Sequence, residues 1–245
     1  MEYDSSDIDS SNTRHCDTGG HGTHVAGIAA GDGSATGNGE PGHTYVGMAP
    51  DADIIFVKNI TSTDALGDSS QLFDAINYIF QKASALGKPA VINISQGDNL
   101  GPHDGSSLLE IGIDNLLSTP GRAVVKSAGN AGKDKIHASG TVIQDNTIEV
   151  PVDVPANDNH EDQITVWYDG TDSISVSVRS PSGASQDSTA FVSVGDSLTD
   201  SLTNGNDVEI VSSLTNPLNG GRNILINLER GTAGDIEDGT WHIRL

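Results

Sequence analysis

The segment DTGGHGTHVAGIAAG, residues 17–31, combines carboxylate and imidazole side chains at spacings that permit several kinds of chemistry. His21 and His24 are three residues apart, so a helix would place both rings on one face. Such a pair suits a metal ion. Further ligands would then come from the neighbouring side chains His15, Cys16 and His43. A capping or core histidine is the second interpretation, and a catalytic base at the start of a helix is the third.

Small residues lie between and after the two histidines. These residues are Gly22, Thr23, Ala26 and Gly27. A helix of this composition can pack very close to its neighbours, because little side chain stands between the two backbones. A metal pair has no need of such small residues, so the pattern favours a catalytic base on a closely packed helix.

Residues 1–137 alternate between helical and strand patterns, which predicts a partial catalytic domain of the α/β class with a mostly parallel sheet flanked by helices. The expected helices are HGTHVAGIAA (21–30), SSQLFDAINYIFQKASALG (69–87) and SSLLEIGIDNLL (106–117). The expected strands are ADIIFVKNI (52–60), AVINIS (90–95) and RAVVKSAGN (122–130). The strands are almost continuously apolar, as expected for a sheet that is covered on both faces.

Residues 138–245, here called the β-rich segment, lose the helical period and show short alternating runs bounded by turn residues. The runs are TIEVPVDV (147–154), QITVWYDG (163–170), SISVSVRSPSG (173–183), AFVSVG (190–195), VEIVSS (208–213), NILINLERG (223–231) and TWHIRL (240–245). This pattern predicts a second, all-β domain that forms an antiparallel, jelly-roll-like sandwich.

Four segments in order resemble the subtilisin-like serine protease family. They are GHGTHVAGIAAG (20–31), VGMAPDADIIFVKNI (46–60), AVINISQG (90–97) and SAGNAG (127–132). The resemblance implies a subtilisin-like α/β fold and an endopeptidase that hydrolyses peptide bonds. It also identifies the β-rich segment as an insertion in the catalytic domain.

The resemblance assigns roles residue by residue. His21 corresponds to the general base and Asn130 to the side-chain donor that stabilises the tetrahedral oxyanion. The substrate-binding positions are Ser95, Gln96 and Gly97 on one strand, Leu66 and Gly67 on the opposite flank, and Ala128 and Gly129 at the wall of the main specificity pocket. Gln96 replaces the apolar residue often found there. Because open parallel sheets bind ligands at the carboxyl ends of their strands, we expect His21 and Asn130 on the same side.

Two further catalytic residues are expected outside this chain. Asp17 follows no apolar strand and is only four residues before His21, so we interpret it as a local residue that either supports the catalytic side chains from behind or caps the helix. The Gly-Thr-Ser of the family does not occur in the sequence. We therefore expect an inactive fragment without the catalytic Ser or Asp. A catalytically dead relative and a β-rich binding or adhesion module are the alternative interpretations.

The composition of the chain limits the classes of molecule that it can bind. The formal net charge is −22, which disfavours nucleic acids and anionic membranes. The charge fits an exported protein and equally a merely well-solvated surface, and we expect an extracellular or cell-surface location. No apolar run is long enough to span a membrane, and the single Cys16 permits no intramolecular disulfide. We expect protein or peptide substrates and the remainder of the catalytic domain as partners. No cofactor is predicted, although acidic loops such as NDNHED (157–162) could hold structural calcium instead of being merely solvated.

Overall fold

The computed structural model describes residues 3–11, 13, 16–36, 38–58, 69–97, 99–182, 187–217 and 219–245. The chain divides into two compact units, Met1–Ile60 and Thr61–Leu245, and each is considered by itself below. The domain boundary predicted between residues 137 and 138 lies inside the second unit and stays a prediction. Among the described residues, no helix has the length and apolar character needed to cross a membrane.

Two helices are described in the first unit, α1 (Ser5–Asp9) and α2 (His21–Ala30). The bounds of α2 are those predicted. α1 is not among the predicted helices, because its short polar sequence carries no apolar period. A reciprocal capping box starts it instead: Asp7 N–H donates to Asp4 Oδ1 and Asp4 N–H donates to Asp7 Oδ2.

The chain after α2 returns along the last turn of that helix. The N–H groups of Met48 and Ala49 donate to the carbonyls of Ile28 and Ala29, at 3.0 and 2.9 Å. These carbonyls belong to the last turn, where a helix has no partner of its own for its C=O groups. The returning loop thus completes the hydrogen bonding at the end of α2.

The strand predicted over residues 52–60 is wrong for its described part, residues 52–58, which contains no strand. Ile54 and Phe56 are 60% and 61% exposed. An apolar run can form a strand only when a neighbouring strand offers its backbone groups, and the described residues of this unit supply no such ladder. Residues 59 and 60 lie outside the described residues.

The second unit opens with α3 (Ser69–Ala85), β1 (Ala90–Ile94), α4 (Leu108–Leu117) and β2 (Arg122–Lys126). All four elements are predicted, and only their ends differ. α3 ends because Gly87 takes a φ of +66°, while the N–H groups of Gly87 and Lys88 donate back to the carbonyls of Ser84 and Ala83.

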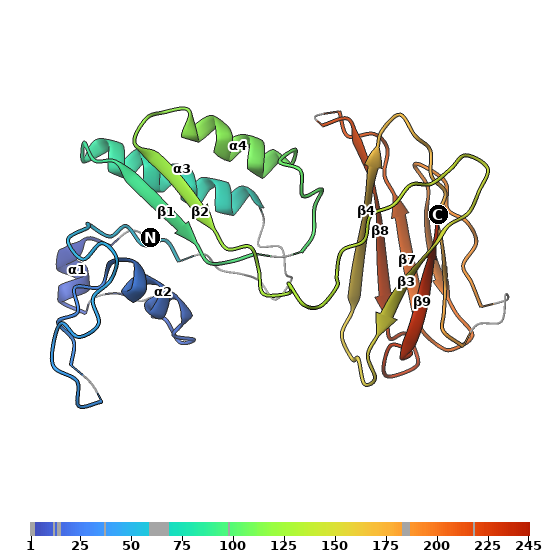
Figure 1. Ribbon diagram of the computed structural model, residues 1–245, viewed down its shortest axis with the longest axis horizontal. Helices are drawn as coiled ribbons and strands as arrows, with labels where there is room; N and C mark the ends of the chain where they lie inside the picture. The colour runs from blue at the N-terminus through green and yellow to red at the C-terminus, as the bar shows by residue number, and fades with distance from the viewer. Residues whose placement is uncertain are drawn as a thin grey trace. The chain divides into compact units, whose positions relative to one another are not determined.

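β1 and β2 are parallel neighbours, and Ile94 lies opposite Lys126 at their ends. α3 packs against α4 and β1, and α4 packs against β2 (Figure 1). The core between them is centred on Ile76, Phe80, Ile92 and Ile94. On the other face of the strands Val91 is 73% exposed and Val125 is 54% exposed. The parallel pairing is confirmed, whereas helical cover on the second face stays a prediction.

The described residues of the β-rich segment form seven strands in two antiparallel sheets (Figure 1). The strands are β3 (Glu149–Val154), β4 (Asp162–Asp169), β5 (Ser177–Arg179), β6 (Ser197–Ser201), β7 (Asp207–Ser212), β8 (Gly221–Glu229) and β9 (Gly239–Arg244). One sheet has the order β3-β9-β5 and the other the order β4-β8-β7-β6. That this segment is a separate all-β domain stays a prediction.

A single apolar core links the strands of both sheets. Its fully buried centre includes Trp241 on β9, Val178 on β5, Ile210 on β7 and Ile226 on β8. The indole Nε1–H of Trp241 donates to the carbonyl of Glu237 at 2.9 Å, so its one polar atom is satisfied inside the core. Burial of each such side chain contributes about 1.5–3 kcal/mol, which holds the segment together.

One strand prediction in this segment is wrong, and one strand of the segment was not predicted. AFVSVG forms only an isolated bridge, in which Val192 pairs with Val176, because the other residues of the run find no second ladder. β6, with the sequence SLTDS, is absent from the predictions. It pairs with β7 although Leu198 is its only apolar residue.

The residue just before β3 pairs with the residue just after β9. Ile148 N–H donates to the carbonyl of Leu245 at 2.9 Å, and Leu245 N–H donates to the carbonyl of Ile148 at 3.0 Å. This pair continues the antiparallel register of β3 with β9.

Candidate active site

The Asp17 carboxylate caps the start of α2. Gly20, the N-cap residue, has a φ of +76° and offers no side chain, so Asp17 replaces it. Oδ1 accepts from Gly20 N–H at 2.8 Å, and Oδ2 accepts from the N–H and the hydroxyl of Thr23 at 2.7 and 2.8 Å. The Thr23 N–H, the Thr23 hydroxyl and the Gly20 N–H lower the pKa of Asp17 to about 2. The predicted capping role is confirmed.

His21 is the first residue of α2 and its side chain is exposed. The next residue shows why the predicted close packing needs glycine. A Cβ on Gly22 would lie 3.3 Å from the Phe56 ring and 3.5 Å from Asp17 Oδ2. The start of the helix is therefore clamped between Phe56 and the capping carboxylate, and His21 projects from a fixed turn.

The metal interpretation of the histidines gains no support from the described residues. They contain no cluster of three or more His, Cys, Asp or Glu side chains that could hold a metal ion. His43 Nδ1 is 3.1 Å from the carbonyl of Asp32. Cys16 is exposed, and its carbonyl accepts from Lys58 Nζ at 2.8 Å. His15 lies outside the described residues.

The segments Ser95–Gly97 and Ser127–Asn130 begin where β1 and β2 end. Because the two strands are parallel, both segments leave the sheet at the carboxyl end of the strands. Ser127 N–H donates to the carbonyl of Ile94 at 3.0 Å. The next carbonyl on that side, Gln96 C=O, accepts from Lys126 Nζ at 2.9 Å and from Ser127 Oγ at 3.2 Å.

These contacts orient the backbone of Ser95–Gly97. Carbonyls of successive residues in an extended chain point to opposite edges, so residues two apart share an edge. Ile94 and Gln96 direct their carbonyls toward β2 and its continuation. The carbonyls of Ser95 and Gly97 therefore point to the other edge, where an added strand could pair with them.

One glycine lies in each of the two segments. A Cβ on Gly97 would lie 2.7 Å from Lys126 Nζ. Gly129 has a φ of +88°, in the left-handed region that favours glycine, and a Cβ there would lie 3.8 Å from Asn99 Oδ1. Ala128 and Asn130 flank this turn and are exposed. The wall predicted for the specificity pocket thus adjoins Asn99.

The structure brings together six of the predicted positions at the carboxyl end of the β1–β2 pair. They are Ser95, Gln96, Gly97, Ala128, Gly129 and Asn130. His21 is described in the first unit and Asn130 in the second, so their expected placement on one side stays a prediction. Leu66 and Gly67 lie outside the described residues. Lys126 and Asn99 were missed by the sequence reasoning. Knowledge of the strand register would have identified Lys126, because the register places the end of β2 beside Gln96.

Comparison with known proteins gives a consistent result. The sequence model of the subtilase family matches residues 1–216. Subtilisin of Bacillus sp. strain TA39 is 38% identical over 113 residues, which cover 46% of this chain and 24% of that protein. The major intracellular serine protease of Bacillus subtilis strain 168 is 34% identical over 116 residues, which cover 47% of this chain and 31% of that protein. The chain thus spans less than a third of either relative.

Among solved structures, the CspB protease of Clostridium perfringens is similar to this chain with a TM-score of 0.74 and 27% sequence identity. The likeness covers 94% of this chain and 47% of that protein. These matches confirm the resemblance read from the four ordered segments. Since the family's sequence model extends over most of the sequence, the chain belongs to the subtilase family.

Proposed function

We propose that this chain is part of a subtilisin-like serine endopeptidase and supplies the general base, the oxyanion donor and one wall of the substrate cleft. The observation that carries the proposal is the pairing of Ser95–Gly97 with the segment that leads to Asn130. Gln96 C=O is engaged with Lys126 and Ser127, which leaves the carbonyls of Ser95 and Gly97 at the free edge. An extended peptide substrate can add there as an antiparallel strand.

In the proposed reaction, the imidazole of His21 accepts the proton of a serine hydroxyl as that oxygen attacks the scissile carbonyl. The side-chain amide of Asn130 donates to the oxygen of the tetrahedral intermediate. His21 then returns the proton to the leaving amine. The clamped first turn of α2 supports the role of His21, because a general base must keep a fixed position near the hydroxyl.

The nucleophile is proposed to come from residues outside this chain. The sequence contains no Gly-Thr-Ser, and Asp17 has both carboxylate oxygens engaged by α2. A base and an oxyanion donor without a nucleophile cannot hydrolyse a peptide bond by this route. The chain alone should therefore be inactive, and the parent protein should be active.

The test uses the full-length parent protein, a generic protein substrate and a fluorophosphonate probe that labels activated serines. We expect wild-type protein to cleave and to label once, at a serine outside residues 1–245. His21→Ala should abolish both cleavage and labelling. The matched control is His24→Ala, which changes the other exposed histidine on the same helix and should keep activity.

Two outcomes would contradict the proposal. A parent protein that folds but neither cleaves nor labels would support the catalytically dead alternative. Labelling of a serine within residues 1–245 would show that the nucleophile is misplaced.

We also propose that the protein works outside the cell or at its surface. The support is the net charge of −22, which keeps a protein soluble in a medium that contains salt and cations. Fractionation of the producing cells, with an antibody against the chain, tests this placement. Recovery in the cytosolic fraction alone would contradict it.

A further inference from the structure

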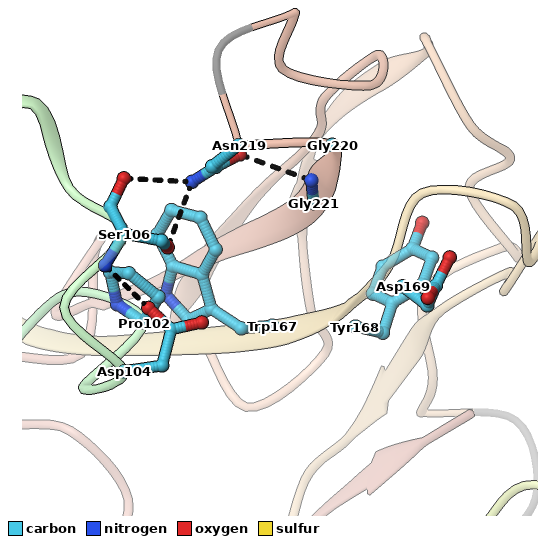
Figure 2. A pocket seen from close by; sticks show the side chains of 9 residues that line it. All are labelled: Pro102, Asp104, Ser106, Trp167, Tyr168, Asp169, Asn219, Gly220 and Gly221. Atoms are coloured by element: carbon cyan, nitrogen blue, oxygen red, sulfur yellow. Dashed lines mark hydrogen bonds between the residues drawn. The ribbon is translucent and has the colours of Figure 1, made fainter.

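The loop of residues 99–107 joins the segment Ser95–Gly97 to the start of α4 and lies against one end of the sheet that contains β4 and β8. Asn219, just before β8, makes the contact. Its Nδ2 donates to Ser106 Oγ at 3.2 Å and lies 3.5 Å from the carbonyl of Ser106 (Figure 2). Its Oδ1 accepts from Gly221 N–H at 3.0 Å, which fixes the orientation of the amide. The amide of Asn219 is thus oriented with its donor toward the loop.

An open pocket interrupts the packing between the loop and the sheet. It has a volume of about 360 Å³, with Pro102, Asp104 and Ser106 on the loop side and Trp167 and Gly221 on the sheet side (Figure 2). The buried Nε1–H of Trp167 has no hydrogen-bond partner among the described residues. Where packing is incomplete, a loop is held mainly by its hydrogen bonds. The contact from Asn219 therefore has more influence on the loop than it would have over a filled core.

The loop connects the contact with Asn219 to the proposed specificity pocket. The backbone reverses at three left-handed residues, Gly101, His103 and Gly105, with φ of 107°, 57° and 81°. His103 Nε2 lies 3.1 Å from the carbonyl of Asn99 and donates to it when that nitrogen carries the proton. Asn99 in turn borders Gly129, the proposed pocket wall.

We propose that Asn219 is a positioning residue for the specificity pocket, so that the β-rich segment helps to select the substrate side chain that precedes the scissile bond. This inference rests on the proposed peptidase function. Release of Ser106 lets the loop shift, and Asn99 moves relative to the wall at Gly129. The width of the pocket changes, while His21 and Asn130 keep their places. The expected effect is on KM for bulky side chains more than on kcat.

The experiment uses the full-length parent protein with Asn219→Asp. This variant keeps an acceptor for Gly221 N–H and loses the donor to Ser106. The matched control is Thr215→Ala, which removes hydrogen bonds to Gly170 and Arg222 within the β-rich segment and leaves Ser106 untouched. Hydrogen exchange of the amides of residues 99–107 is measured beside kcat and KM for two peptides that differ only in the size of the residue before the scissile bond.

We expect Asn219→Asp to raise exchange in residues 99–107 by about fivefold to tenfold, the equilibrium effect of one typical hydrogen bond. The ratio of KM values for the two peptides should change by a similar factor. Thr215→Ala should change neither. If Asn219→Asp does not fold, Ser106→Ala removes the Oγ acceptor from the other side and should shift both readouts in the same direction.

The result that would overturn the proposed function differs from the result that would overturn this inference alone. A wild-type parent that neither labels nor cleaves overturns the proposed function, and with it any role in selection. A parent that cleaves normally, but whose Asn219→Asp variant keeps wild-type exchange or the wild-type ratio of KM values, overturns this inference alone.

Discussion

The ammonium group of Lys126 donates a 2.9 Å hydrogen bond to the carbonyl of Gln96. Lys126 is the last residue of β2, and Gln96 lies just beyond the end of β1. The bond therefore extends the contact between two parallel strands beyond their backbone ladder. In the proposed function, this bond decides which carbonyls of Ser95–Gly97 remain at the edge where a peptide could add.

Lys126→Met should weaken peptide binding in the full-length parent. The hydrophobic stem is kept and the donor is lost, so Gln96 C=O retains only the 3.2 Å bond from Ser127 Oγ. We expect KM to rise about fivefold with little change in kcat, because one hydrogen bond contributes about 1 kcal/mol. Steady-state kinetics on an extended peptide measures this. Lys133→Met, at an exposed lysine in the following loop, is the control. Equal KM values for Lys126→Met and wild type would refute the positioning role.

Asp17 should make the start of α2 sensitive to acid. Its pKa is lowered from 3.8 to about 2, so the ionised form is preferred in the folded state. A lowered pKa contributes stability above the unfolded value, and that contribution is lost as the pH falls through about 2. Hydrogen exchange of α2 should show protection that disappears as the pH falls from about 3.8 to about 2. Asp17→Ala should show weak protection already at neutral pH.

The matched control for the acid experiment is Asp51→Ala, which removes an exposed carboxylate outside the helix. It should retain the wild-type profile. If the difference between Asp17→Ala and wild type persists unchanged to the lowest pH, ionised Asp17 is not the cap.

Gly47→Ala should destabilise the first unit. A Cβ at this position would lie 2.5 Å from Gly31 N and 2.8 Å from Gly27 O, and backbone atoms cannot move aside as flexible side chains can. Overpacking of this kind typically costs about 1–3 kcal/mol. Gly27→Ala is the contrasting variant, because its Cβ would meet nothing within 4 Å beyond its own helix. Alanine in a helix is favoured over glycine by about 1 kcal/mol.

Hydrogen exchange of α2 and of the returning loop reports both glycine variants locally. We expect faster exchange for Gly47→Ala and slower exchange for Gly27→Ala. The same direction of change in both would show that packing at Gly47 is looser than described.

Trp241→Ala should unfold the β-rich segment at much lower denaturant concentration. The side chain is fully buried, and removal of a buried aromatic ring costs about 3–5 kcal/mol. Trp241→Phe keeps most of the volume, loses the bond to Glu237 C=O and should cost less. Urea unfolding followed by circular dichroism measures both. Similar losses for the two variants would indicate that the hydrogen bond, not the packing, dominates.

The helices of the second unit were the easiest elements to predict. The apolar residues of α3 recur with the helical period, and Gly87 marks its end. α4 begins at Ser107, whose hydroxyl accepts from Glu110 N–H in a capping box. Period and capping are local properties, so they can be read from neighbouring residues without knowledge of the fold.

The strands show the limit of this reasoning. Residues 52–58 are as apolar as β1, yet they contain no strand. SLTDS is mostly polar, yet it forms β6 because β7 offers it an edge. Pairing depends on partners far along the chain, and a local pattern does not contain that information.

The residues of the candidate site show the same difference between local patterns and distant partners. The positions Ser95–Gly97 and Asn130 were assigned because their motifs AVINISQG and SAGNAG resemble those of the protease family. Lys126 could not be assigned, since only the register of β1 with β2 brings it beside Gln96, and Asn99 could not, since only the folded loop brings it beside Gly129. The capping role of Asp17 was accessible from its four-residue spacing to His21, a local relationship.

The reciprocal hydrogen bonds between Ile148 and Leu245 have a consequence for how the strands between them are closed. The backbone between these two residues starts and finishes at neighbouring points, as the backbone of a hairpin turn does. The ladder of β3 with β9 lies directly beside this pair, so its hydrogen bonds offset the entropy of closing so long a loop.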